Sequence, residues 1–445
     1  MKRELAREVA RLAWPVILQG LLSTAVFFTD RLLLGSYSDA ALGSMQISGP
    51  VLWSMAAVLG AFSAGTMAII GRSVGAKDPE RVRDTLVTSL WLSVLVGGLM
   101  CVAGLLGKEL IASVMGGGPG TTQELRDLAI EYMSVVFLMA PIAHVGVTGV
   151  VALQAGGDTR SPMWAVAISG VVNLGVSWIL IFGHLGAPEL GIYGAAIGTV
   201  ASYGVQAVLV LMVLYRSEGM VKLRGFPKPQ LGPLKPILKV SGPTFLERGI
   251  FHFAFLCYAA FVGLLGDIAM TANQSLIAIE SLGFMVSYGF GVAASTLVAQ
   301  KLGAERPEDA AACGWISTWM AALLLTFIGA FFLIFAVELA ALFSDDPEVV
   351  SLAADCLRVA GVAQPLMAIT DALAGGLRGA GDTRSPMVVA IIGPLVIRLA
   401  ACWLLAFHWE MGLLGIWIAT TFDWAVRAVV LAIIFRRGRW KTIQV

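Results

Sequence analysis

The chain has few charged residues for its length. Asp, Glu, Lys and Arg make up 13% of its 445 residues, whereas hydrophobic residues make up 58%. Soluble globular domains carry a charge on about a quarter of their residues. This chain therefore has too little charge to cover a water-exposed surface of its size, and its composition indicates a membrane protein.

The chain also lacks the residue patterns of several other protein classes. Its four histidines and five cysteines are isolated from one another and form no CxxC pair, which argues against a metal site and a disulfide framework. The formal net charge is +1 and the basic residues are dispersed along the chain, so the sequence lacks the basic patch that is typical of nucleic-acid-binding proteins. No HExxH or GxSxG motif is present. We expect no enzymatic activity, no cofactor, no metal and no nucleic-acid partner.

What the chain does have is a series of long apolar runs. Twelve stretches are long enough to cross a lipid bilayer, which takes about 20 residues each. They cover residues 14–35, 47–70, 86–107, 128–153, 163–183, 191–215, 240–263, 270–298, 314–337, 350–377, 387–407 and 412–435. We therefore predict an all-α integral membrane protein with twelve transmembrane helices.

The distribution of basic residues predicts the orientation. If the N-terminus is cytoplasmic, 23 of the 30 Lys and Arg residues fall in cytoplasmic segments and only Lys108 and Arg126 in outer loops. Cytoplasmic loops are enriched in Lys and Arg. We predict a multi-pass protein of the plasma membrane with both termini in the cytoplasm.

One heptapeptide, GDTRSPM, occurs twice. It fills residues 157–163 and again 381–387, an offset of 224, about half of the chain. A repeat at half-length indicates two halves built on one plan. Because each half has six spans, both halves enter the membrane in the same direction, as in parallel repeats. We predict two six-helix lobes related by a parallel pseudo-two-fold axis.

The longest polar stretch separates these halves. It covers residues 216–239 and contains six Lys and Arg residues with four prolines. We assign residues 1–215 to an N-lobe, 216–239 to a cytoplasmic linker and 240–445 to a C-lobe.

The repeated heptapeptide also predicts where helices begin. Serine is a favoured N-cap residue, and proline is tolerated in the first turn of a helix. We expect Ser161 and Ser385 to cap the helices that follow, with Pro162 and Pro386 in their first turns.

Asp30 is the strongest candidate for a functional residue. It lies within the first span, and at an offset of 228 its counterpart in the second half is Tyr258. The repeat therefore does not require an acid here, although a charge at membrane depth costs several kcal/mol. Removal from water disfavours the charged form of a carboxyl, so Asp30 could exchange a proton or bind a cation. The alternative is an ion pair with Arg31, but adjacent helical residues do not face each other.

Four acids of the second half are expected to be buried within spans: Glu247, Glu280, Asp371 and Asp423. Asp423 and Arg427 stand at i and i+4 and are expected to pair. Glu247 and Asp371 either belong to a functional site or neutralise Arg248 or Arg398. Outside this set, Asp355 and Arg358 are expected to form an i, i+3 pair.

Several segments, taken in order, resemble the multidrug and toxic compound extrusion (MATE) family. They are WPVILQGLLSTAVFFTDRLLLG at the start, VGAKDPER and LGAERPED after spans 2 and 8, and LQAGGDTRSPM and LRGAGDTRSPM after spans 4 and 10. The resemblance covers essentially the whole chain. It implies twelve helices in two lobes, alternating access, and export of organic cations in exchange for H⁺ or Na⁺.

The resemblance also implies site residues. Asp30 follows Pro15 by fifteen residues, as the coupling aspartate does in many family members. Its partners in the N-lobe would be Asn173 and Thr199, with Ser177 where the family has a second aspartate. The site would then hold one carboxylate and three neutral ligands, which suits H⁺ or Na⁺.

A second site in the C-lobe is implied by other family branches. They use a Glu in span 7 and an Asp in span 10, and Glu247 and Asp371 stand about one turn from those positions. With Glu280 they form a possible C-lobe site. Residues i and i+4 share a helix face, so the role can survive this shift.

We therefore expect a monomeric secondary antiporter in the lipid bilayer that exports amphipathic organic cations. The alternative is a flippase or exporter of lipid-linked molecules or metabolites from the same superfamily, which would use a cationic cavity. A channel is a third possibility, and ion flux without a substrate requirement would favour it.

Overall fold

The computed structural model describes residues 2–116, 122–225, 228 and 230–444, and this part of the chain is helical, without strands. It divides into two compact units. We call Leu18–Thr66 with Lys77–Ile237 the N-unit, and Met1–Ile17, Met67–Ala76 and Leu238–Val445 the C-unit. The C-unit thus includes the start of the first helix and the end of the second. The expected lobe boundary at residues 216–239 stays a prediction.

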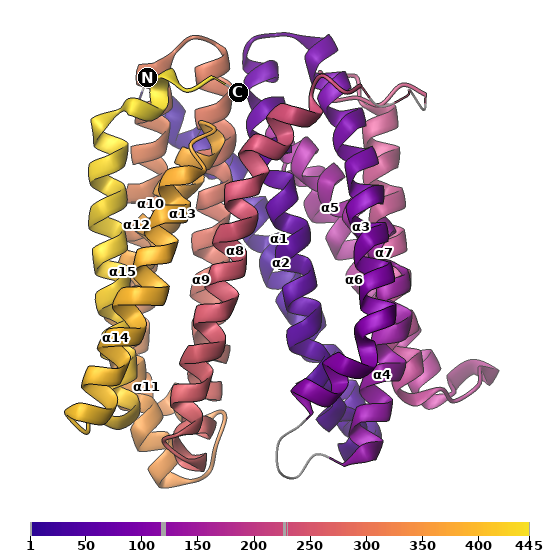
Figure 1. The fold of residues 1–445 in the computed structure, drawn as a ribbon, viewed down its shortest axis with the longest axis vertical. Helices are drawn as coiled ribbons and strands as arrows, with labels where there is room; N and C mark the ends of the chain where they lie inside the picture. Colours follow the sequence, from indigo (N-terminus) through magenta and orange to yellow (C-terminus); the bar gives the residue numbers. More distant parts are fainter. Residues whose placement is uncertain (1, 117–121, 226–227, 229, 445) are drawn as a thin grey trace. The chain divides into compact units, whose positions relative to one another are not determined.

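The N-unit contains most of α1 (Lys2–Tyr37) and α2 (Asp39–Gly75). Its other helices are α3 (Pro79–Met115), α4 (Gln123–Leu138), α5 (Ala140–Ala155), α6 (Arg160–Phe182) and α7 (Gly191–Arg216), with the short η1 (His184–Gly186) before α7 (Figure 1). Its core contains Tyr132, Met133 and Phe137 of α4, which pack near Ile181 of α6 and Ala195 of α7. Packing of this kind holds the N-unit helices together.

The predicted span 128–153 is in fact two helices. α4 and α5 meet at an angle of 56°, directly before Pro141 in the first turn of α5. Proline has no backbone N–H to donate to the preceding turn and its ring clashes with that turn, so it ends or kinks a helix. Gly97 of α3 accommodates the bend, because a Cβ there would lie 2.5 Å from the Cα of Pro141.

The C-unit contains the remaining helices. They are α8 (Leu234–Gly263), α9 (Asp267–Gly303), α10 (Pro307–Ile334), α11 (Ala336–Ala341), α12 (Pro347–Gly379), α13 (Arg384–Ala390), η2 (Ile391–Arg398), α14 (Leu399–Cys402), η3 (Trp403–His408), α15 (Gly412–Arg437) and η4 (Arg439–Thr442). The run from α13 to η3 is one continuous span, Arg384–His408, in which η2 and η3 are π-helical. Pro394 lies inside η2 and cannot donate to the preceding turn. In this unit α1 begins and α15 ends at the same end (Figure 1).

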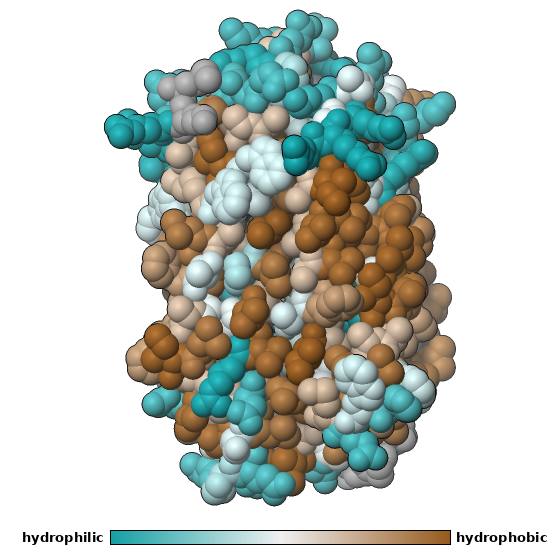
Figure 2. Space-filling model, turned by 90° about the vertical axis from the view of Figure 1, so that its left-hand side faces the viewer, coloured by the Kyte–Doolittle hydropathy of each residue, from teal (hydrophilic) through white to brown (hydrophobic). Residues whose placement is uncertain are grey.

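Helices long and apolar enough to cross a membrane dominate the structure. The described residues hold eleven such helices, and α4 with α5 completes the twelve predicted spans. Large apolar side chains point outward along them, and Leu106 is 82% exposed. Figure 2 shows a broad apolar band between hydrophilic ends on the face that it draws. The chain is therefore a multi-pass membrane protein, since a helix satisfies its own backbone hydrogen bonds in lipid.

The repeated heptapeptide forms the same turn in both halves, but serine does not cap the helix. Gly157 and Gly381 both have positive φ, at 91° and 85°. Asp158 Oδ1 accepts the backbone N–H of Ser161, at 3.0 Å, and Asp382 Oδ1 accepts that of Ser385, at 3.1 Å. The expected serine caps are wrong. The side chain that accepts a free backbone N–H at the start of each helix is the aspartate three residues before the serine, Asp158 or Asp382. The serine N–H groups are the ones that are capped.

Candidate functional site

The site begins with a close approach of α6 and α7 in the N-unit. Gly194 and Gly198 stand four residues apart in α7, a spacing typical of tightly packed membrane helices. A Cβ on Gly194 would lie 2.6 Å from the backbone carbon of Leu180, and one on Gly198 would overlap Ser177 Oγ. This glycine seam sets the position of the Ser177 hydroxyl.

Ser177 and Asn173 lie one turn apart on α6 and are both buried, at 0% and 2% exposure. Residues i and i+4 share one face of a helix, so the amide and the hydroxyl lie along the same line. Both side chains interact with the carboxyl of Asp30, which α1 holds half-buried. The structure thus brings together three of the four predicted N-lobe residues.

Two oxygen atoms of this cluster are buried without a hydrogen-bond partner among the described residues. They are Asp30 Oδ1 and Ser177 Oγ. Buried polar atoms are nearly always hydrogen-bonded, and the exceptions call for an explanation such as a bound ion or a functional role. A proton on the carboxyl, or a cation held between oxygens, would satisfy both atoms.

Thr199 reaches the cluster indirectly. Its hydroxyl lies 3.1 Å from the phenol oxygen of Tyr132 and donates to the carbonyl of Ala195 at 3.1 Å. Tyr132 of α4 and Tyr203 of α7 are close enough to Asp30 to interact electrostatically with its carboxyl. Thr199 therefore orients Tyr132.

Sequence reasoning missed both tyrosines. Asp30 was marked because its counterpart in the other half is of a different chemical type, and the same comparison applies to Tyr132. At the offset of 224, its counterpart is Cys356.

Arg31 does not neutralise Asp30. Its guanidinium lies 4.0 Å from the ring centroid of Phe27, one turn earlier on α1, and against Gly49 of α2. No ion pair joins Arg31 to Asp30 within the described part of the chain. The separation follows from the helix, in which adjacent side chains point about 100° apart.

In the C-unit, Glu247 pairs with a residue that the sequence did not suggest. Arg378 Nη2 donates to Glu247 Oε1 at 2.8 Å. The expected partners Arg248 and Arg398 are therefore wrong for this acid. Arg378 follows the span on α12 and is 131 residues away from Glu247, so no local spacing could have identified the pair.

Asp371 and Glu280 lie in the electrostatic field of arginines. Asp371 Oδ2 accepts the hydroxyl of Ser287 at 2.7 Å, and Arg378 and Arg427 act on its carboxyl from a greater distance. Glu280 faces Arg398. Both acids therefore have a positive charge nearby.

The expected pair Asp423–Arg427 is confirmed, and it has a third member. Arg427 Nη2 lies 3.0 Å from Asp423 Oδ2, and Arg398 donates to the same oxygen from Nη2 at 2.6 Å and from Nε at 3.0 Å. Arg427 also lies 3.7 Å above the ring of Trp424. Asp355 and Arg358 form the expected surface pair at 2.6 Å. Asp423 thus holds the buried guanidinium of Arg427 and the half-buried one of Arg398, which marks it as structural.

The five acids within spans that are buried or half-buried therefore differ in one respect. Glu247 and Asp423 form ion pairs with arginine, and Asp371 and Glu280 face arginines. Asp30 has neutral partners instead. An acid whose charge is not balanced by the protein needs a proton or a cation to stay at membrane depth. Within the described ranges, no group of three or more His, Cys, Asp or Glu side chains could hold a metal ion.

Comparisons with known proteins agree with this architecture. The profile of the MatE family matches residues 15–179 and 243–404. The chain is 28% identical over 441 residues to "Probable multidrug resistance protein NorM" of Thermotoga maritima, covering 98% of this chain and 94% of that protein. It is 30% identical to a protein of the same name from Rhodopseudomonas palustris, covering 97% and 91%. Its fold is similar to that of a MOP superfamily transporter from Pyrococcus furiosus, with a TM-score of 0.90, 22% identity and coverage of 99% and 97%.

Proposed function

The chain belongs to the MatE family, and from this premise we propose that it is a secondary antiporter that exports amphipathic organic cations in exchange for H⁺ or Na⁺. The relatives that match nearly its whole length are named as multidrug resistance proteins, which supports efflux of several compounds. The series of apolar spans supports movement of the substrate across the membrane.

One observation carries the assignment of the coupling site. Among the buried and half-buried acids within the spans, Asp30 is the one whose partners, Asn173 and Ser177, are neutral. A carboxylate paired with arginine keeps its charge balanced whether or not an ion is bound. A carboxylate without such a partner is stabilised when H⁺ or Na⁺ binds to it. The fraction of protein with a bound ion therefore follows the ion gradient. We therefore assign the coupling ion to Asp30, with Asn173 and Ser177 as its supporting ligands and Thr199 acting through Tyr132.

The C-unit acids Glu247, Glu280 and Asp371 are the second candidates for this role. Their arginine neighbours favour a structural role, because the carboxylates are already compensated. The same neighbours argue against a flippase for phosphate-bearing substrates. Arg427 and Arg398 are bound to Asp423 and do not form a free cationic cavity.

Efflux of a cationic dye from proteoliposomes tests the proposal, with a pH gradient and a Na⁺ gradient imposed separately. We expect one gradient to drive efflux in wild type and Asp30→Asn to abolish it. Asp39→Asn removes an exposed acid from the same unit and is the matched control. If Asp30→Asn transports normally while Glu247→Gln or Asp371→Asn does not, the coupling site lies in the C-unit. If no gradient drives efflux of any cationic dye, the transport proposal itself fails.

A further inference from the structure

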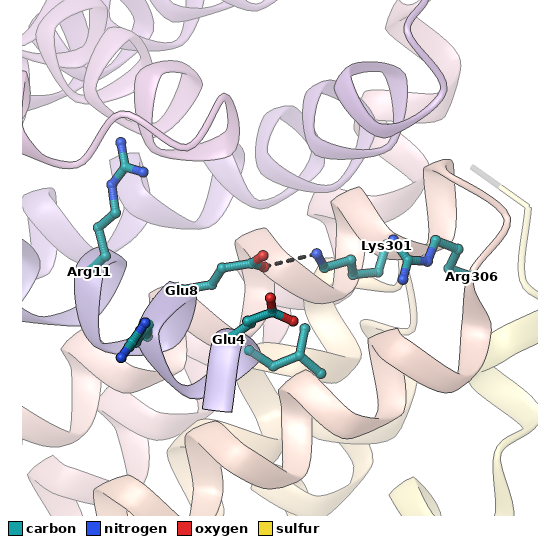
Figure 3. A pocket seen from close by; sticks show the side chains of 7 residues that line it. Glu4, Glu8, Arg11, Lys301 and Arg306 are labelled. Atoms are coloured by element: carbon teal, nitrogen blue, oxygen red, sulfur yellow. Dashed lines mark ion pairs between the residues drawn. The ribbon is translucent and has the colours of Figure 1, made fainter. Parts of the chain in front are cut away.

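A cavity of about 490 Å³ lies beside the first turns of α1, within the C-unit. Six charged side chains line it. Glu4, Arg7, Glu8 and Arg11 come from α1, and Lys301 and Arg306 come from the end of α9 and the turn that leads to α10 (Figure 3). Leu5 is the one apolar residue in this lining. The cavity is therefore formed by two segments that are about 290 residues apart in the sequence.

The helical period explains why α1 presents charges here. Leu5, Val9, Leu12 and Ala13 face the C-unit core. Residues 4, 7, 8 and 11 follow the i, i+3, i+4, i+7 spacing of one helix face and lie beside that apolar stripe. The apolar stripe fixes α1 on the unit and directs the charged stripe along the cavity.

The charges of the cavity do not balance, because four basic side chains line it and only two acidic ones, Glu4 and Glu8. Glu8 is neutralised by Lys301, whose Nζ lies 2.8 Å from Glu8 Oε2 (Figure 3). Arg306 forms an ion pair with Asp309. Arg7 and Arg11 are exposed and form no ion pair with a described residue. Two guanidinium groups one turn apart are thus left beside the cavity, and guanidinium is the side chain best suited to bind phosphate through two N–H groups.

The position of the cavity identifies the source of such a phosphate. Three residues beyond Arg11, Trp14 begins the apolar stretch of α1 and is 44% exposed. Exposed tryptophan marks the level of lipid headgroups. The cavity therefore lies at the boundary between the polar end and the apolar band, where the phosphates of the surrounding lipids are found. Basic pockets at such a boundary bind anionic headgroups.

We propose that this cavity binds the phosphate headgroup of an anionic phospholipid, with Arg7 and Arg11 as its principal donors and Lys301 and Arg306 at its rim. The acyl chains would lie along the exposed apolar surface of α1. A lipid held in this way would fix the first turns of α1 to the α9–α10 turn. The cavity shares no residue with the Asp30 site, and the proposal does not depend on the transported substrate.

The test measures lipid binding to the full-length protein in detergent by native mass spectrometry. Phosphatidylglycerol, phosphatidylcholine and inorganic phosphate are titrated separately. We expect phosphatidylglycerol to bind at least tenfold more tightly than phosphatidylcholine. Each basic side chain contributes roughly a fivefold effect on binding to an anionic lipid, so Arg7→Gln/Arg11→Gln should weaken phosphatidylglycerol binding by roughly 25-fold and leave phosphatidylcholine unchanged.

The matched control is Arg436→Gln/Arg437→Gln, which removes two exposed arginines from the end of α15. It should retain wild-type lipid binding, and the midpoints of thermal unfolding should show that all variants fold. Equal binding of the two lipids, or an equal loss in the control, would overturn the proposal. If inorganic phosphate at the same concentration displaces phosphatidylglycerol, the site binds free phosphate and the proposal of a lipid headgroup is wrong.

Discussion

Substitution of Gly198 by alanine should disturb the Asp30 site without touching Asp30. The new methyl group would overlap Ser177 Oγ and lie 3.0 Å from the backbone nitrogen of Ser177. Overpacking of this kind lowers the free energy of unfolding by about 1–3 kcal/mol. The higher helix propensity of alanine offsets about 1 kcal/mol of this loss. We therefore expect the free energy of unfolding to fall by about 1 kcal/mol. Gly175→Ala on α6 is the control, because nothing lies within 4 Å of its added Cβ.

The larger effect should be on the binding of the coupling ion. Displacing the Ser177 hydroxyl removes a neutral oxygen that acts on the Asp30 carboxyl and has no hydrogen-bond partner of its own among the described residues. The Na⁺ concentration for half-maximal dye efflux should therefore rise several-fold, because a bound Na⁺ loses an oxygen ligand. The H⁺ concentration for half-maximal efflux should instead fall, because the Asp30 carboxyl loses an interaction that favours its charged form. In a Ser177→Ala background the overlap and the hydroxyl are both absent, so Gly198→Ala should add little to the ion dependence. The reasoning is refuted if Gly198→Ala behaves like Gly175→Ala, or if its effect persists in full without the Ser177 hydroxyl.

Two further predictions concern stability. Arg378→Gln leaves Glu247 buried without its partner and should lower the free energy of unfolding by about 3–5 kcal/mol. Glu247→Gln/Arg378→Gln should be less destabilised than Arg378→Gln alone, as measured by thermal unfolding, and a double variant as destabilised as the sum of both single variants would contradict the pair. Asp382→Ala removes the acceptor at the start of α13 and should cost about 1 kcal/mol, whereas Ser385→Ala should cost less. Hydrogen exchange over Arg384–Ala390 distinguishes the two, and greater opening in Ser385→Ala would contradict the aspartate cap.

The spans could be predicted because their signal is local. An apolar run of about 20 residues is visible in the sequence, and the doubled GDTRSPM is enough to indicate two halves. The bend between α4 and α5 was not predicted. Pro141 breaks its span, whereas its repeat counterpart Pro365 lies inside the continuous helix α12. Whether a proline ends a helix depends on what packs around it, and only the structure shows that Gly97 accommodates the bend.

The candidate site was predictable only in part. The pair Asp423–Arg427 follows from helical spacing, and so does the shared face of Asn173 and Ser177. That Asp30 lies beside this face came from family resemblance, because no spacing relates α1 to α6. Arg378 with Glu247 and Arg398 with Asp423 join different helices, and sequence alone cannot choose among several arginines at similar depth.

The site itself is tested most directly by the movement of the coupling ion. Proteoliposomes loaded with a cationic substrate are diluted into substrate-free buffer, and uptake of H⁺ or Na⁺ into the lumen is followed. We predict that substrate exit drives uptake of one of these ions in wild type and in Glu247→Gln/Arg378→Gln. Asp30→Asn should show no substrate-driven uptake. Substrate-driven ion uptake at the wild-type rate in Asp30→Asn would contradict the assignment of the coupling ion to Asp30.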